Sequence, residues 1–226
     1  MKQRLADYVA DFLVAHGIKD CFMITGGGAM HLNDALGHKE GLKCTYNHHE
    51  QACAIAAESY ARVNNTMAAL CVTTGPGGTN AITGVLGGWL DSVPMFVISG
   101  QVRYDTTARY MEQFTDGYKM RAVGDQEFDI TKSVGSMCKY AVMIEDTSRI
   151  RYELEKAYHL ATTGRRGPVW IDIPLNYQGS IIETDDLKRY DPKEDEAVEV
   201  PTVDVNDVRE IIKKIKNSKR PVLYAG

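Results

Sequence analysis

Short apolar runs alternate with stretches of helical periodicity along most of this chain, and this alternation constrains the fold more than any other feature of the sequence. The runs suited to strands are Cys21–Ile24, Leu42–Tyr46, Met67–Thr73, Pro94–Ser99, Tyr140–Ile144 and Pro168–Pro174. Helical patterns separate most of them, whereas residues 103–135 are less regular and predict a loop with one or two short helices. Alternation of this kind predicts an α/β fold, in which a doubly wound, mostly parallel sheet carries helices on both faces.

The composition of the chain changes after this main domain, which we predict to span residues 1–178. Residues 179–203 are rich in acidic side chains and poor in apolar ones, so we expect a solvated linker there. Residues 204–226 begin with a helical pattern and lead into Arg220–Gly226, which is typical of the first strand of another α/β unit. Because a buried strand needs a neighbour to pair with, we expect the natural protein to continue beyond it.

Charge and cysteine usage exclude several classes of function. A net charge of −4 gives no basic surface for nucleic acid. The apolar runs are shorter than the roughly 20 residues that a membrane span needs, and the N-terminus is amphipathic, unlike a signal peptide. Five cysteines without a C-x-x-C pair, with Cys21, Cys44 and Cys71 in or beside apolar runs, are typical of small core residues. We therefore expect a cytoplasmic protein with no nucleic-acid and no membrane partner.

Unusual loops follow neighbouring strands of the predicted sheet. They are Thr25–Gly28, His48–Glu50, Thr73–Gly78 and Ser99–Gln101. In an open parallel sheet, ligands bind at the carboxyl ends of the strands, so these loops should line one common edge. Glycines in such loops let a ligand approach the backbone closely, although short strand-to-helix turns often need glycine in any case.

A single carboxylate, Glu50, stands at the start of a helical segment that is nearly all small and apolar. We expect this helix, to about Val63, to be buried on most sides, because a helix facing water shows polar residues every three or four positions. The position of Glu50 also has a purely structural interpretation, because a carboxylate at the start of a helix interacts favourably with the helix dipole. The preceding His48 and His49 are interpreted as structural residues of the turn.

A nucleotide-binding module is an alternative that the same residues allow. Gly26–His31 matches G-x-G-x-x but has His31 in place of the third glycine, and Glu50 lies at about the distance of a ribose-binding acid. Such a module would bind NAD or a sugar nucleotide. The Gly75–Asn80 loop lacks the Gly-Lys-Ser/Thr of a Walker loop. A non-catalytic interaction domain is a third interpretation.

Several sequence blocks, taken together, resemble the acetolactate synthase family of thiamine-diphosphate enzymes. His49-Glu50-Gln51-Ala52 with the block Ala56–Arg62 resembles H-E-x-x-A…A-x-G-Y-A-R, and the other matching blocks are Gly27–Ala29, Thr73–Asn80, Asp91–Pro94, Ser99–Val102 and Gly167–Pro174. They occur in the family's order over about residues 3–176. The chain is thus similar to the N-terminal, pyrimidine-binding domain of such enzymes, followed by the start of a central domain.

The resemblance implies roles for individual residues. Glu50 would hydrogen-bond the aminopyrimidine of thiamine diphosphate and help convert the cofactor to its ylide, and Gln126 would be an active-site glutamine. Residues implied to lie around the cofactor are Thr25, Gly26, Gly27, Glu50, Thr73, Pro76 and Asn80. A carboxyl in a water-poor setting holds a proton more readily, which suits this chemistry. The diphosphate and Mg²⁺ would be held by a separate C-terminal domain, so we expect no metal ligands here and an inactive fragment; FAD is a further cofactor that the resemblance allows.

Departures from the family pattern bear on the substrate. Thr25-Gly26 replaces the usual Tyr-Pro, Asp125 replaces the phenylalanine before the glutamine, and Arg103–Val123 is longer than the usual connection. The resemblance therefore implies a decarboxylase or carboligase acting on a 2-keto acid, with an acceptor other than a second pyruvate. One candidate acceptor is a nucleotide-linked keto sugar of surface polysaccharide synthesis, to which a paralogue of the synthase would add the acyl unit. A homodimer or tetramer is expected, with the small-residue Glu50 helix at the interface.

Overall fold

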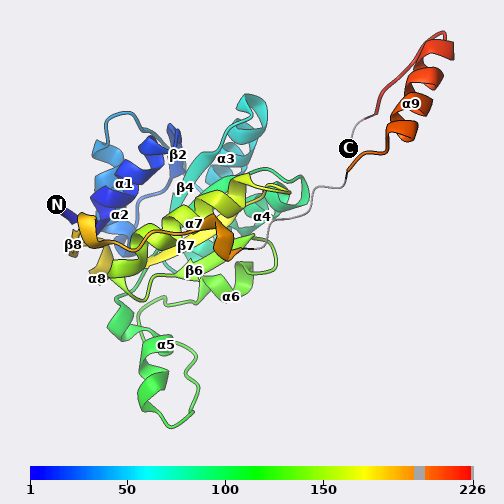
Figure 1. Cartoon of the computed structure of the whole chain (residues 1–226). Coiled ribbons are helices and arrows are strands. Elements are labelled where there is room, and N and C mark those ends of the chain that lie inside the picture. Colours follow the sequence, from blue (N-terminus) through cyan, green and yellow to red (C-terminus); the bar gives the residue numbers. More distant parts are fainter. Residues whose placement is uncertain (196–201, 225–226) are drawn as a thin grey trace. The chain divides into compact units, whose positions relative to one another are not determined.

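The computed structural model of the chain describes residues 1–195 and 202–224 (Figure 1). It divides into two compact units, Met1–Glu194 and Asp195–Gly226. The first unit holds the sheet and its helices, and it is described first.

A six-stranded sheet forms the centre of the first unit, with the order β3-β2-β4-β5-β7-β6 and every neighbouring pair parallel. Its strands are β2 (Asp20–Met23), β3 (Lys43–Tyr46), β4 (Ala68–Val72), β5 (Met95–Gln101), β6 (Tyr140–Met143) and β7 (Val169–Pro174). Strands β4, β5 and β7 are buried along their whole length, which explains their unbroken apolar sequences. The predicted doubly wound parallel sheet is confirmed.

Helices cover both faces of this sheet. One face packs against α1 (Leu5–Ala15), α2 (Met30–His38) and α7 (Ile150–Thr162), and the other against α3 (Glu50–Asn64), α4 (Pro76–Leu90) and α6 (Ile130–Val134). Successive strand residues point to opposite faces, so Phe96 and Ile98 lie in the first core and Met95 and Val97 in the second. The remaining short helices are α5 (Ala108–Met111) and α8 (Leu175–Gln178). Helices α5 and α6 confirm the short helices expected in residues 103–135.

The stretch expected to be a solvated linker is partly folded onto the first unit. Strand β8 (Ile181–Glu183) pairs antiparallel with β1 (Lys2–Arg4), a strand that the sequence analysis did not predict. Ile182, Leu187 and Tyr190 are buried. These few apolar residues anchor the stretch, so the prediction of a solvated linker is wrong for its first part. Residues 196–201 of the predicted linker lie outside the described residues.

The second unit contains α9 (Val205–Asn217), which confirms the helical pattern after the linker. The strand expected at Arg220–Gly226 is absent from residues 220–224, which have no regular secondary structure; the last two residues lie outside the described range. The physical reason is that a strand forms only with a hydrogen-bonding neighbour.

The strand order fixes where a ligand can bind. The chain runs from β2 to β3, which lies on one side of β2, and then to β4, which lies on the other side of β2. The connections after β2 and β4 therefore leave toward opposite faces, through α2 and α4, and a crevice opens between them at the carboxyl ends of these strands. The loops that border this crevice are Ile24–Gly28 and Thr73–Gly75.

Candidate functional site

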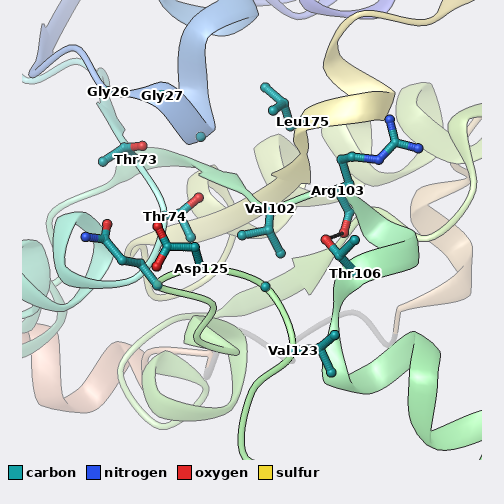
Figure 2. A pocket seen from close by; sticks show the side chains of 13 residues that line it. Gly26, Gly27, Thr73, Thr74, Val102, Arg103, Thr106, Val123, Asp125 and Leu175 are labelled. Atoms are coloured by element: carbon teal, nitrogen blue, oxygen red, sulfur yellow. Dashed lines mark hydrogen bonds between the residues drawn. The ribbon is translucent and has the colours of Figure 1, made fainter.

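A pocket of about 670 Å³ lies at the carboxyl edge of the sheet, where the strand order reverses. It is lined by Gly26, Gly27, Gly28, Thr73, Thr74, Val102, Arg103, Thr106, Val123, Gly124, Asp125, Gln126 and Leu175. Figure 2 shows Thr73, Thr74 and Asp125 on one side of it and Arg103 and Thr106 on the other. The volume is typical of a small-molecule site.

Glycines let the pocket loops approach one another closely. A Cβ on Gly28 would lie 2.0 Å from Oγ1 of Thr74, and a Cβ on Gly100 would lie 2.1 Å from the carbonyl oxygen of Gly28. That same carbonyl accepts a hydrogen bond of 2.7 Å from Nε2 of Gln178, and Thr74 Oγ1 donates to the carbonyl of Gly100 at 3.2 Å. The loops after β2, β4 and β5 are therefore joined directly, as the sequence predicted for a common edge.

Glu50 is the first residue of α3, and its side chain faces the start of α4. Nδ2 of Asn80 donates a hydrogen bond of 3.0 Å to Oε2 of Glu50. The other oxygen, Oε1, would lie 3.7 Å from a Cβ on Gly77, and the same Cβ would lie 2.8 Å from Cγ2 of Thr73. Among the described residues, no hydrogen-bond donor engages Oε1. Glu50 therefore lies next to the pocket loop through Gly77 and Thr73, with one carboxylate oxygen held and one available.

The surroundings of α3 differ from the expectation of a helix buried on most sides. Cys53, Ala54 and Ala57 are buried, but Ile55 is 46% exposed and Val63 is 82% exposed. Glu50 itself is only partly buried. The prediction failed because the sequence does not distinguish apolar residues buried in the core from apolar residues exposed at the surface. His49, in turn, is structural as interpreted, since its Nδ1 accepts a hydrogen bond of 3.1 Å from the backbone N–H of Gln51 and caps the helix.

Gln126 enters the pocket wall through a tight turn. Its backbone is left-handed, with φ of 58°, and the backbone N–H of Glu127 closes the turn on the carbonyl of Gly124 at 3.2 Å. Gly75 packs beneath this turn, because a Cβ there would lie 2.1 Å from the carbonyl oxygen of Gln126. The loop after β4 therefore supports the residue that the resemblance singled out.

A buried hydrogen-bonded network lies beneath the pocket, on β5 and β7. Asp172, fully buried, accepts hydrogen bonds of 2.6 Å from Oγ of Ser99 and 3.0 Å from Nε2 of Gln101. Nε1 of Trp170 donates to the same Ser99 oxygen at 2.8 Å. Burial raises the pKa of the Asp172 carboxyl to about 7, although the two hydrogen bonds act to lower the pKa.

The structure brings together some of the residues named from the sequence and not others. Gly26, Gly27, Thr73 and Gln126 line the pocket, and Glu50 and Asn80 form a bonded pair beside it. Within the described part of the chain, Thr25 and Pro76 are exposed and are not among the residues that line the pocket. Pro76 begins α4 at a position that proline favours. The roles assigned to all these residues stay predictions.

Other pocket residues were missed by sequence reasoning. Leu175 and Thr106 line the cavity, and Asp172 lies beneath it. Leu175 follows the carboxyl end of β7, so the rule that predicted the other loops could have found it. The signal for Asp172 was a single carboxylate within the apolar run Val169–Pro174.

Three further features concern only residues 1–195 and 202–224. No group of three or more His, Cys, Asp or Glu side chains there could hold a metal ion. In the same residues, no helix has both the length and the apolar character that crossing a membrane requires. The five cysteines are free; Cys21 and Cys71 are buried, as expected for core residues, whereas Cys44, also expected in the core, is only half-buried.

The fold and the glycine-lined edge define an α/β ligand-binding domain, and comparison with known proteins identifies its family. Residues 3–120 match the family described as "Thiamine pyrophosphate enzyme, N-terminal TPP binding domain", and the chain belongs to this family. The chain is 32% identical to acetolactate synthase 3, chloroplastic, of Brassica napus, over 98% of the chain and 32% of that protein. It is 31% identical to the acetolactate synthase large subunit of Haemophilus influenzae, over 98% of the chain and 36% of that protein. The chain therefore spans about a third of the length of these relatives.

Proposed function

We propose that this chain is the pyrimidine-binding domain of a thiamine-diphosphate-dependent enzyme that decarboxylates a 2-keto acid and transfers or releases the acyl unit. The observation that carries the proposal is the position of Glu50. Its carboxylate is fixed by Asn80 at Oε2 and has Oε1 available, beside a glycine-lined pocket at the edge where ligands bind in such sheets. Membership of the family and the likeness to acetolactate synthases support the same assignment.

The residues around the pocket fit the pyrimidine part of the cofactor. Gly27 has open space in place of a side chain, with no heavy atom within 4 Å of an added Cβ, so a flat ring could approach the backbone. Thr73 supplies a hydroxyl and a methyl group at the pocket wall. Oε1 of Glu50 is the atom that would exchange a proton with a ring nitrogen, while Asn80 keeps the carboxylate oriented. When bound, the cofactor supplies a carbon acid whose conjugate base adds to the keto carbon of the substrate.

Substitution of Glu50 in the complete protein that carries this domain tests the proposal. With thiamine diphosphate and Mg²⁺ supplied, Glu50→Gln should lower kcat for 2-keto acid decarboxylation by about 100-fold or more, because an amide cannot shuttle the proton. Glu40→Gln makes the same chemical change at an exposed residue in the loop before β3, whereas Glu50 follows that strand, and it should leave kcat unchanged. Full activity of Glu50→Gln would reject the catalytic role and favour a non-catalytic interaction domain.

We also propose that different domains bind different parts of the cofactor. We expect the diphosphate and Mg²⁺ to be held by a C-terminal domain outside these 226 residues, so this chain alone should bind the cofactor weakly and show no turnover. Isothermal titration of the chain with thiamine diphosphate and Mg²⁺ measures this. A low-micromolar dissociation constant would contradict it.

A homodimer, with the paired helices α3 and α4 at the interface, is the assembly that we propose. Along their length these helices expose Ile55, Leu86 (38% exposed) and Leu90 (63% exposed). A second copy there would cover apolar surface and remove water from Glu50. Sedimentation of the complete protein should show a dimer that Leu86→Asp weakens, whereas Ile181→Asp, at an exposed apolar residue of β8, should not. A monomeric wild type would reject the proposal.

An acceptor other than a second pyruvate is the finer part of the proposal. The pocket wall contains the charged residues Arg103 and Asp125, contributed by the long connection after β5. We expect such a wall to favour a polar acceptor, for which a nucleotide-linked keto sugar is a candidate. Product analysis after incubating the complete protein with pyruvate, alone and with such an acceptor, distinguishes the two cases. The NAD or sugar-nucleotide module remains an alternative, which a thermal-shift panel on the chain would test.

A further inference from the structure

The long connection between β5 and α6 is closed at its base by one side chain, Glu127. Its Oε1 accepts a hydrogen bond of 2.6 Å from the backbone N–H of Ala108, the first residue of α5. Its Oε2 accepts from the backbone N–H groups of Val123 at 2.6 Å and Gly124 at 3.3 Å. One carboxylate therefore joins the outgoing and returning parts of the connection. Hydrogen bonds to an ionised acceptor are shorter and stronger than neutral ones, which makes this an effective closure.

Glu127 is the last residue of the turn that reaches the pocket. That turn, Gly124–Glu127, presents Asp125 and Gln126 to the cavity. Gly75 limits the turn from below and Val102 from the side, since an added Cβ on Gly124 would lie 2.8 Å from Cγ2 of Val102. The Glu127 carboxylate adds hydrogen bonds to the backbone N–H groups of Val123 and Gly124, which restrain the residues that enter the turn.

A second closure lies just inside the first. Oε1 of Gln101 accepts from the backbone N–H of Val102 at 3.0 Å, and Nε2 of Gln101 donates to the carbonyl of Phe128 at 2.8 Å. Gln101 is in turn held by the buried Asp172. The sheet therefore holds the two ends of the connection in place. Glu127 in turn restrains the nearby residues that line the cavity.

The part of the connection between Ala108 and Val123 extends away from the body of the first unit (Figure 1). Phe114 and Tyr118 in it are 66% and 72% exposed. It has its own internal contacts, such as the hydrogen bond of 3.0 Å from the backbone N–H of Met120 to Oε1 of Glu112. Motion of this extended part would reach the pocket turn unless the base of the connection were closed.

We propose that Glu127 is a positioning residue for the pocket: by joining Ala108 to Val123 and Gly124, it holds Asp125 and Gln126 where they contact the substrate. This rests on the proposed function for the nature of that substrate, a 2-keto acid. Because Glu127 acts on the substrate wall and not on Glu50, its loss affects substrate binding and leaves cofactor activation unchanged.

The test uses the complete enzyme and three readouts. For Glu127→Ala we expect KM for the 2-keto acid to rise at least about tenfold. Exchange of the cofactor's C2 proton, followed by NMR with thiamine diphosphate and Mg²⁺ bound, should stay within about twofold of wild type, since Glu50 is untouched. Hydrogen–deuterium exchange of peptides containing Ala108 and residues 123–126 should accelerate at least about tenfold. Glu112→Ala, which also removes a carboxylate bonded to a backbone N–H in the same connection, should change exchange near Met120 and leave KM at the wild-type value.

Glu127→Gln is a milder second variant that keeps the test decisive if Glu127→Ala does not fold. Its amide keeps one acceptor oxygen but directs N–H groups at the other donors, so an intermediate rise in KM is expected. A folded Glu127→Ala or Glu127→Gln protein with wild-type KM would overturn the proposal, and so would a parallel loss of C2-proton exchange. A wild-type enzyme without turnover of any 2-keto acid would instead reject the proposed function, and the amide exchange at Ala108 and residues 123–126 would still decide whether Glu127 closes the connection.

Discussion

Asn80 in the second turn of α4 donates a 3.0 Å hydrogen bond to Glu50, the first residue of α3, and the two helices pack against each other. The close packing depends on small side chains. An added Cβ on Gly84 would lie 2.5 Å from Cβ of Ala54 and 2.8 Å from the backbone nitrogen of Ile55. The position of Glu50 relative to Asn80 is therefore set by a helix contact more than a turn away from either residue.

Gly84→Ala should destabilise the first unit by about 1–3 kcal/mol, because the new methyl group would force α3 and α4 apart. Gly87→Ala is the matched control, since it lies on the same helix with open space around its added Cβ. There the higher helix propensity of alanine should stabilise the protein by up to about 1 kcal/mol. Urea unfolding of the chain followed by circular dichroism measures both. Equal effects of the two substitutions would contradict the close helix contact.

Gly75 supports the Gln126 turn, and substitution there should cost more than backbone strain alone. Gly75 has φ of 57° and ψ of −112°, a backbone conformation that strongly favours glycine, and Gly117 has φ of 87°, so alanine at either position meets backbone strain. Only at Gly75 would the new Cβ also meet the Gln126 carbonyl, whereas Gly117 has no heavy atom within 4 Å. Gly75→Ala should therefore lower the free energy of unfolding by at least about 1 kcal/mol more than Gly117→Ala. Similar losses in urea unfolding would show that the two loops are not in contact.

Thiol alkylation should distinguish Cys44 from the other cysteines. Cys44 is half-buried on the edge strand β3, whereas Cys21, Cys53, Cys71 and Cys138 are buried. Burial also raises the pKa of Cys71 and of Cys138 to about 12, which suppresses the reactive thiolate. Under native conditions iodoacetamide should modify Cys44 first, with all five cysteines reacting in denaturant, as peptide mass spectrometry would show. Early modification of Cys71 would contradict the buried β2–β4 core.

The sequence predicted the central sheet well because buried parallel strands leave a local signature. Val169–Pro174 and Met95–Gln101 are apolar over most of their length, and the helices between strands have their own periodicity. The pairing of Lys2–Arg4 with Ile181–Glu183 left no such signal, because both segments have only three residues and Lys2–Arg4 is entirely polar. Contacts between distant segments of this kind depend on the finished fold.

The candidate site was likewise predictable in some parts and not in others. The glycine loops at Gly26 and Thr73 were predictable, because parallel strands carry their following loops to one edge. The exposed side of α3 was not, since the sequence does not show whether an apolar residue such as Ala54 or Ile55 faces the core or the surface. The closure by Glu127 was also out of reach, because its partners are backbone N–H groups, which every sequence contains.

Asp172 should make the stability of the first unit fall as the pH rises from about 4 to about 7. Burial raises the pKa of its carboxyl to about 7 in the folded chain, whereas an unfolded aspartate titrates near 3.9. Between these values the folded state binds the proton more tightly than the unfolded state, so folding is favoured at the acid end and the advantage is lost toward pH 7. At about 1.4 kcal/mol per pH unit, the loss is up to about 4 kcal/mol.

Asp172→Asn isolates this effect, because asparagine has no proton to lose and can keep contacts to Ser99 and Gln101. The free energy of unfolding of Asp172→Asn relative to wild type should therefore increase from pH 4 to pH 7 in urea titrations. Asp129 provides a control of opposite sign. Burial alone would raise the pKa of Asp129, but hydrogen bonds from Thr131, Arg109 and Lys132 outweigh it and lower the pKa to about 2. Its contribution is therefore present above pH 4 and lost as the pH falls toward 2, so Asp129→Asn should cost stability at pH 6 and progressively less below pH 4. If Asp172→Asn instead tracked the wild type across pH 4–7, the buried carboxyl would have to be ionised throughout that range.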